Sequence, residues 1–412
     1  MNNTENISKK SRISGGTSKL NNLYRKYIVN SGVDVYMLAI IVLMGFCGLV
    51  MVFSASYAYA FSSTGDSTYY IRKQLIFMML GFLGMLFIAF FTKSSLFKKF
   101  AIPVYFVSLL LLAMVLVMGV SEGEAKRWLY LGPIGFQPSE VTKYALVVML
   151  AWYYQRFYKK VHQKKFWNSF LYSTLIPGVI VLVPAGLVLL ENHLSGFVII
   201  MLIGVTVMWI GGANKWVFSI GFLVVAALVI GFVFWCKVSP DSVKELFPKE
   251  YMFKRVDMWL NPENYDVQSD TWQTVQGKIA VGSGGFFGRG LGKSLQKHLF
   301  VSQPQNDFIY SIICEELGFV GGVSVIILYF VFMFRGYHIA KNAHDMFSAI
   351  TVIGIVGHVG IQALLNIGVV TGILPNTGIT LPFFSAGGSS LLILLAEMGI
   401  ILTISKHSRV DR

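Results

Sequence analysis

Ten mostly apolar stretches alternate with short polar segments along this chain. Runs of roughly 17–25 apolar residues can cross the hydrocarbon core of a bilayer as single α-helices. The pattern therefore predicts ten membrane-spanning helices. They cover residues 34–54, 75–91, 101–120, 138–157, 170–190, 195–211, 215–235, 308–334, 348–370 and 387–404. The fifth and sixth are separated by only a few residues, so we expect them to form a tight helical hairpin.

The composition agrees with a membrane protein of the all-α class. Of the 412 residues, 55% are hydrophobic and only 13% are charged, whereas a soluble domain carries about 25% charged residues. The net charge of +14 would suggest nucleic acid binding in a soluble protein. Here the basic residues collect in particular loops, so we expect no nucleic acid partner. The three cysteines and seven histidines have no metal-binding spacing.

The distribution of basic residues predicts the orientation in the membrane. Most lysines and arginines outside the spans fall in the two tails and in alternate loops on one side. Cytoplasmic loops carry such an excess, so both tails should be cytoplasmic. This divides the chain into a basic tail of residues 1–33, a membrane domain of residues 34–405 and a short tail of residues 406–412. The long loop of residues 237–307 is then external.

That long loop should have a function of its own, because structureless loops of this length are uncommon. Apolar residues recur at helical spacing among charged ones within residues 251–260, which is typical of a helix lying in the membrane interface. The Asn-Pro pair that follows should end it. A second helix is expected to begin at Trp272, with Asp270 as its cap.

Two charged residues lie inside the start of the fourth predicted span. The span opens with Gln137-Pro138-Ser139-Glu140. Lys143 follows on the same helix face as Glu140, so the two can pair. An ionisable group at membrane depth is costly and is a functional candidate by default. The pair is either a neutralised structural contact or part of a polar cavity near the outer leaflet, and the sequence leaves both interpretations open.

Four cations lie on the external side, against the charge bias: Arg72, Lys73, Lys126 and Arg127. Each alone could extend its charged end to the membrane surface. Together they suggest a site for an anionic lipid headgroup, and both interpretations stay open.

Several further polar residues lie at or near the ends of spans. Glu315 and Glu316 fall inside the eighth span and Asp307 directly precedes it. Glu191 and His193 occupy the turn of the helical hairpin, where they are either solvated or functional. The segment of residues 374–390 contains prolines and glycines that prevent a continuous helix, yet it carries no charge. Unwound backbone at membrane depth has to be buried in protein or line a cavity, so we expect its hydroxyls to face a cavity.

A glycine-rich segment, GGFFGRGLGKSLQK at residues 284–297, resembles a phosphate-binding loop. A Walker loop needs four residues between its first glycine and Gly-Lys-Ser, and starting from Gly288 leaves three. A nucleotide site is therefore not predicted. The glycines still allow the backbone to approach a ligand closely, and Arg289, Lys293 and Lys297 supply positive charge.

These positions together resemble the SEDS family (shape, elongation, division and sporulation), which includes RodA, FtsW and SpoVE. The resemblance covers roughly residues 34–405, and overall likeness favours the FtsW/SpoVE branch. The motifs that carry it lie at residues 124–128, 135–143, 288–297, 307–309, 315–318 and 378–390.

The resemblance implies a peptidoglycan glycosyltransferase of the bacterial cytoplasmic membrane that polymerises lipid II at the outer face. It implies Asp266, ahead of Trp272-Gln273, as the catalytic residue, and a carboxylate there could act as general base. The glycine-rich segment would then meet the pyrophosphate of the lipid carrier near Asp266. The substrate-binding candidates are Arg72, Lys73, Arg127, Gln137, Ser139, Glu140, Lys143, Lys297, Asp307, Ser385 and Ser389.

The resemblance also implies partners: a class B penicillin-binding protein, which is the transpeptidase, and other divisome proteins. A divalent cation, Mg²⁺ or Mn²⁺, stays open as a cofactor, because His193 stands where the family has an acid. A role in division, elongation or sporulation is not decided by the sequence.

Two other functions compete with the enzyme. A flippase for the lipid-linked precursor would also need outward cations and a cavity, but it should have a polar path to both faces and inverted halves. The cytoplasmic halves of the spans look apolar, and no internal repeat is visible. A scaffold that only recruits a partner would not need Glu140, Lys143 and Asp266 together.

Overall fold

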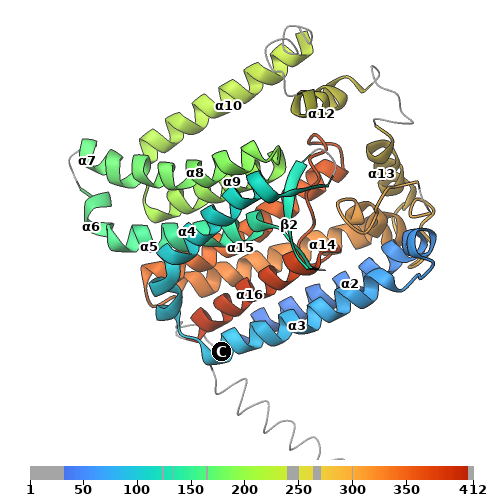
Figure 1. Ribbon diagram of the computed structural model, residues 1–412, viewed down its shortest axis with the longest axis horizontal. Helices are drawn as coiled ribbons and strands as arrows, with labels where there is room; N and C mark the ends of the chain where they lie inside the picture. The colour runs from blue at the N-terminus through green and yellow to red at the C-terminus, as the bar shows by residue number, and fades with distance from the viewer. Residues whose placement is uncertain are drawn as a thin grey trace, which may run out of the picture.

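The computed structural model describes residues 32–122, 125–132, 134–163, 166–238, 250–262, 271–298 and 300–406, and most of them are helical (Figure 1). The longer helices are α2 (Val35–Thr64), α3 (Tyr69–Phe91), α4 (Ser94–Met118), α5 (Pro138–Arg156), α8 (Ile176–Leu190), α9 (Leu194–Gly211), α10 (Lys215–Val238), α12 (Glu250–Leu260), α13 (Trp272–Ser283), α14 (Ile309–Lys341), α15 (Met346–Val370) and α16 (Gly388–Ser405). Shorter elements are β1 (Val120–Glu122), β2 (Ala125–Leu131), β3 (Ile134–Phe136), α6 (Tyr158–Val161), α7 (Phe166–Phe170) and the π-helical turn η2 (Leu171–Leu175).

The predicted fold class, a helical protein that crosses the membrane several times, is confirmed. Within the described residues, eight helical stretches are long and apolar enough to cross a bilayer. They comprise α2, α3, α4, the stretch from α7 to α8, α9, α14, α15 and α16. The two remaining predicted spans coincide with α5 and α10, so a count of ten spans stays a prediction.

Helix α2 is longer than the hydropathy pattern predicts. It was expected to end near residue 54 but continues to Thr64, where Gly65 closes it with φ of 73°. The polar residues that suggested an end, such as Ser54 and Ser56, are buried inside the bundle. Tertiary packing therefore extends a helix whose hydrophobic run has already stopped.

A small antiparallel sheet between α4 and α5 was not predicted. Its strands lie in the order β1, β2, β3, and β2 pairs with β3 through Leu129 opposite Phe136. The strands are short and lie between two apolar helices, so their alternation signal is weak. The sheet matters because β2 carries Arg127 and Trp128.

The helices of the bundle pack in neighbouring pairs, and α3 against α16 and α14 against α15 are the most extensive. Helix α10 stands apart at the top of Figure 1, with α12 beside its far end. Helix α2 packs very closely on the segment before α16. A Cβ added at Gly48 would lie 2.0 Å from the carbonyl oxygen of Phe383, so only glycine fits there.

The segments outside the predicted spans agree with several sequence predictions. Helix α12 ends at Leu260, before the Asn-Pro pair, and α13 begins at Trp272. The N-cap position of α13 is Thr271, while the proposed cap Asp270 lies outside the described residues. The irregular segment between α15 and α16 is confirmed, and its residues Leu381 and Phe384 are buried in the bundle. The position of α12 at a membrane interface stays a prediction.

Candidate active site

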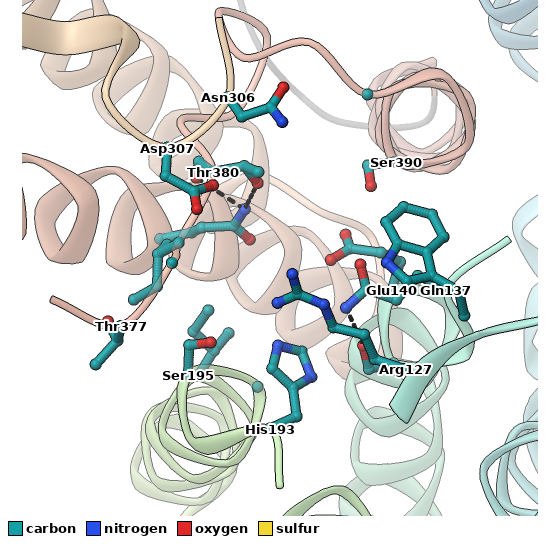
Figure 2. Close-up of a pocket in the computed structure, with 18 of the residues that line it drawn as sticks. Arg127, Gln137, Glu140, His193, Ser195, Asn306, Asp307, Thr377, Thr380 and Ser390 are labelled. Carbon is teal, nitrogen blue, oxygen red and sulfur yellow. Dashed lines mark hydrogen bonds between the residues drawn. The ribbon is translucent and has the colours of Figure 1, made fainter. Parts of the chain in front are cut away.

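A polar cavity of about 500 Å³ lies where several non-helical segments meet. It is enclosed by β2, by the first turns of α5 and α9, by the chain before α14, and by the irregular segment before α16. In Figure 2 the labelled side chains from these elements surround one open space, with Arg127 and His193 directed into it. The site is therefore assembled from parts of the chain that are far apart in the sequence.

The start of α5 provides one wall of this cavity. Pro138 is the first residue of the helix, and the Gln137 amide donates to the Ser139 hydroxyl at 3.0 Å. The Lys143 ammonium lies 2.9 Å from the Glu140 carboxylate, and both residues line the cavity. The ion pair predicted from their spacing is therefore present. The two charges neutralise each other, and the pair also forms part of the cavity wall.

Strand β2 contributes donors that have no partner inside the protein. Arg127 and Trp128 both line the cavity. The Arg127 Nε and the Trp128 Nε1 atoms are buried and make no hydrogen bond. Buried donors are nearly always paired. A ligand in the cavity with acceptor oxygens would therefore supply the missing hydrogen-bond partners of both donors.

The turn between α8 and α9 places His193 and Ser195 in the cavity. Burial, together with the nearby Arg127 cation, lowers the pKa of His193 to about 3, so the imidazole is neutral at physiological pH. Its Nδ1 atom has no partner. Gly196 lies under the ring, and a Cβ there would be 2.6 Å from Nδ1. The turn is buried rather than solvated.

The opposite wall supplies amides, hydroxyls and two further charged side chains, those of Asp307 and Arg255. Asn306, Asp307 and Thr380 line it. Arg255 reaches the cavity from α12, and its Nη1 atom donates to the Asn376 carbonyl at 2.7 Å. The cavity thus combines cationic groups with many neutral hydrogen-bonding groups, a combination that suits a phosphorylated carbohydrate.

Some predicted binding residues lie elsewhere. Arg72 is exposed and paired with Asp66, and Lys73 donates to the Tyr69 hydroxyl at 2.6 Å. Neither lines the cavity, although Arg127 of the same predicted group does. Local partners at the start of α3 hold both side chains. The structure therefore does not bring Arg72 and Lys73 together with Arg127 at this cavity, and their binding of substrate stays a prediction.

The two predicted serines of the irregular segment also differ from expectation. Ser385 is buried, accepts a hydrogen bond from the Leu381 amide at 2.7 Å and donates to the Asn306 carbonyl at 2.7 Å. It braces the segment rather than facing the main cavity. In place of Ser389, the cavity is lined by its neighbour Ser390.

The glycine-rich segment binds carboxylates of its own chain. The backbone amides of Leu295 and Gln296 donate to the Glu315 carboxylate at 2.9 and 3.3 Å. The Lys297 ammonium lies 2.8 Å from the Glu316 carboxylate, and both side chains are buried. Two internal acids therefore occupy the amides and the cation that a phosphate would otherwise use.

The segment and Lys297 were predicted to meet the substrate pyrophosphate, but in the structure they bind these two acids. The glycines serve close packing instead. Gly288 has φ of 78°, and a Cβ there would lie 2.2 Å from the Glu316 carbonyl oxygen. Glu316 also accepts from the Ser54 hydroxyl of α2 at 2.8 Å. The segment thus fastens α2 to α14.

Lys297→Met is expected to lower the free energy of unfolding by about 3–5 kcal/mol, because it leaves Glu316 buried without its cation. The loss would be measured as reduced thermal stability of the purified protein in detergent. Lys293→Met is the matched control, since Lys293 lies in the same segment and is exposed. The additional change Glu316→Gln should recover part of the loss. Equal stability of the two lysine variants would contradict the buried ion pair.

Glu191, at the end of α8, is buried, and its Oε1 atom has no partner. Burial raises the pKa of this carboxyl to about 8. The pKa of Glu191 in the folded state is higher than its value of about 4.3 in the unfolded chain. The carboxyl therefore contributes fully to the stability of the fold at pH values below about 4.3. The contribution is lost as the pH rises through about 8.

The wild-type melting temperature should therefore fall between these two pH values, and Glu191→Gln should remove that part of the fall, since the amide cannot ionise. Asp66→Asn serves as the comparison, because Asp66 is an acid outside the bundle core. Parallel melting curves for wild type and Glu191→Gln at all pH values would refute the assignment.

A metal site is not found in the part of the chain that the structure describes, where no group of three or more His, Cys, Asp or Glu could hold an ion. The catalytic candidate Asp266 lies outside the described residues. The sequence analysis missed Trp128, Arg255, Gln362 and Thr380 among the lining residues. His358 and Glu397 were not predicted either. Both lie inside apolar spans, and an ionisable side chain at that depth was the signal that could have indicated them.

Fold and cavity together define a helical membrane protein with a polar site built where several connections between its helices meet. Residues 34–410 match the family model of FtsW, RodA and SpoVE, described as a cell cycle protein. The chain belongs to this family.

Individual relatives cover almost the whole chain. A probable peptidoglycan glycosyltransferase FtsW of Trichlorobacter lovleyi is 35% identical over 90% of this chain and 93% of its own. Stage V sporulation protein E of Bacillus subtilis is 34% identical over 91% of this chain and 98% of its own.

Solved structures of similar fold agree with this family membership. A chain from a peptidoglycan synthase complex that coordinates polymerization and crosslinking has a TM-score of 0.72 at 27% identity, covering 92% of this chain and 99% of that one. The rod shape determining protein RodA of Thermus thermophilus has a TM-score of 0.65 at 26% identity, covering 92% and 98%.

Proposed function

We propose that this protein is a peptidoglycan glycosyltransferase that polymerises lipid II at the outer face of the bacterial cytoplasmic membrane. The observation that carries the proposal is the polar cavity, in which Arg127 and Lys143 lie beside unpaired donors and neutral hydrogen-bonding groups. Relatives that carry the name peptidoglycan glycosyltransferase cover nearly all of the chain, which supports the same activity here.

In the proposed reaction, the 4-hydroxyl oxygen of an acceptor sugar attacks the anomeric carbon of a lipid-linked donor. The bond from that carbon to the pyrophosphate oxygen breaks, and the lipid pyrophosphate leaves with the bonding electron pair. The proton of the hydroxyl passes to the carboxylate of Asp266 as general base. The helices on either side of Asp266, α12 and α13, each bring a side chain to the cavity, Arg255 and Gln273, which supports a place for Asp266 near it.

The cations have a defined task in this reaction. Negative charge grows on the pyrophosphate as the bond breaks, and fixed cations in a site shielded from water stabilise that charge without having to reorganise. Arg127 and Lys143 are the residues proposed for it. Glu140 holds the Lys143 ammonium, and the nearby His193 is neutral, so it adds no charge beside Arg127.

We further propose that the protein works with a class B penicillin-binding protein, the transpeptidase, and with other divisome proteins. The structural similarity to a chain from a peptidoglycan synthase complex supports this. A divalent cation, Mg²⁺ or Mn²⁺, remains a proposal from the family resemblance, and no step above depends on it.

The direct test is polymerisation of purified lipid II by the purified protein, with and without the transpeptidase. Glycan chains longer than the starting disaccharide are the expected product. A flippase would instead move the headgroup across liposome membranes without an acceptor. Translocation without polymer would therefore replace the proposed function with transport.

A further inference from the structure

A row of buried polar side chains continues from the cavity wall into the interior of the bundle. The Lys143 ammonium donates to the Gln362 Oε1 atom at 2.8 Å. The His358 Nε2 atom lies 3.0 Å from the same oxygen, and its Nδ1 atom lies 3.3 Å from the Glu397 carboxylate. The row thus joins α5, α15 and α16.

This row extends beyond the cavity wall to the middle of two membrane-spanning helices. His358 is at the middle of the 25-residue helix α15, and Glu397 is near the middle of the 18-residue helix α16. Their exposed fractions are 4% and 1%. A small second cavity of about 40 Å³ lies between Glu140 and Glu397. Buried ionisable groups at membrane depth are costly and call for a function.

The hydrogen bonds determine where the protons are. The Gln362 Nε2 atom donates to the Thr380 carbonyl at 3.1 Å, which fixes the orientation of the amide. The Gln362 oxygen therefore faces both Lys143 and His358, and since it can only accept, His358 must carry a proton on Nε2. The Nδ1 atom of His358 faces a carboxylate oxygen. A stable contact there needs one more proton, shared between His358 and Glu397.

The shared proton makes the pair electrically neutral in either arrangement, as imidazole with carboxylic acid or as imidazolium with carboxylate. The neighbouring helix α5 supplies the other titratable groups: Glu140 and Lys143, already paired with each other, and Tyr144, which interacts with Glu397. Loss of the shared proton would leave a buried negative charge beside the Lys143 ammonium. Such a charge competes with Glu140 and the cavity for that cation.

We propose that His358 and Glu397 are positioning residues that hold the Lys143 ammonium at the cavity wall through the side-chain oxygen of Gln362. The task of Lys143 in catalysis rests on the proposed function. The ammonium has two acceptors, Glu140 and Gln362. The Gln362 oxygen is kept in place from behind by His358, which Glu397 orients in turn. The Gln362 oxygen, His358 and Glu397 thus support the Lys143 ammonium, the group that is proposed to act on the substrate.

The test uses the full-length protein with lipid II and the transpeptidase, and it compares two variants with wild type. His358→Phe/Glu397→Leu removes both members of the pair. Replacing a buried polar pair by apolar residues of similar size is often neutral for stability, so the variant should fold and melt as wild type does. Its kcat should fall about 10- to 100-fold, the cost of misplacing a catalytic group, with a smaller change in KM.

Glu397→Gln is the matched control. Its amide can donate to the His358 Nδ1 atom, so the support stays in place without the shared proton. The variant should keep near-wild-type kcat at neutral pH.

The proton itself can be detected without turnover. Histidine nitrogen chemical shifts of isotope-labelled protein should differ at His358 between wild type and Glu397→Gln. Identical shifts, or a double variant with wild-type kcat, would overturn the proposal. So would a loss of activity fully explained by a lower melting temperature. An inactive wild type would contradict the proposed function instead, and the chemical shifts would still decide whether the proton is shared.

Discussion

Asp266→Asn is expected to insert and fold as wild type does but to make no detectable glycan polymer. The amide has the same shape as the carboxylate but cannot accept the proton of the attacking hydroxyl. General base catalysis contributes about 10²- to 10⁴-fold to a rate, so polymer synthesis should fall by that factor. The measurement is the amount and length of glycan made from purified lipid II, with the transpeptidase present.

Asp270→Asn is the matched control for this variant. It makes the same chemical change in the same loop, four residues further along the sequence. It is expected to keep most of the activity, because no part in the reaction is proposed for Asp270. Wild-type polymer yield from Asp266→Asn would disprove the assignment of the base, and an equal loss in both variants would point to a general effect on the loop.

Arg127→Gln should lower kcat/KM for polymerisation about 10²- to 10³-fold, the effect of removing one fixed donor from a developing negative charge. The Arg127 side chain lines the cavity and its Nε atom has no protein partner. Among the residues that the structure describes, no acid is paired with Arg127, so the melting temperature of the variant should stay close to that of wild type.

The adjacent Lys126 provides the control, because it is exposed and does not line the cavity. Lys126→Gln removes the same charge one residue away and should change kcat/KM little. Similar losses in the two variants would mean that Arg127 acts only through the general positive charge of this face. Restoration of activity to Arg127→Gln by higher substrate concentration would assign it to ground-state binding instead.

Local patterns in the sequence predicted those parts of the site that lie within one element. The Glu140–Lys143 pair followed from helical spacing, and a place in a cavity wall was one of the two interpretations that the cost of charge at membrane depth left open. The irregular segment before α16 was predicted for the same kind of reason, since its prolines and glycines cannot continue a helix. Arg127 was found only as one of four predicted external cations, and the other three do not line the cavity.

Contacts between distant segments could not be predicted in this way. The sequence suggested that Lys297 would bind a phosphate, but its partner is Glu316, and Ser54 of another helix bonds to the same carboxylate. Both glycine-rich loops that bind phosphate and glycine-rich loops that bind internal carboxylates expose backbone amides. Only the position of α14 distinguishes between them.

The sequence by itself determined that this is a helical membrane protein, approximately where its helices lie, and which polar groups are placed at costly depth. These properties depend on the transfer of each residue between water and hydrocarbon, and that cost is a local quantity. Tertiary structure alone decided which charges neutralise one another and which remain available to a substrate. Lys297 is paired with Glu316 of α14 because the fold brings that helix within a few ångströms, and it does not line the cavity. Lys143 is paired with Glu140 of its own helix, and the fold places that pair in the cavity wall.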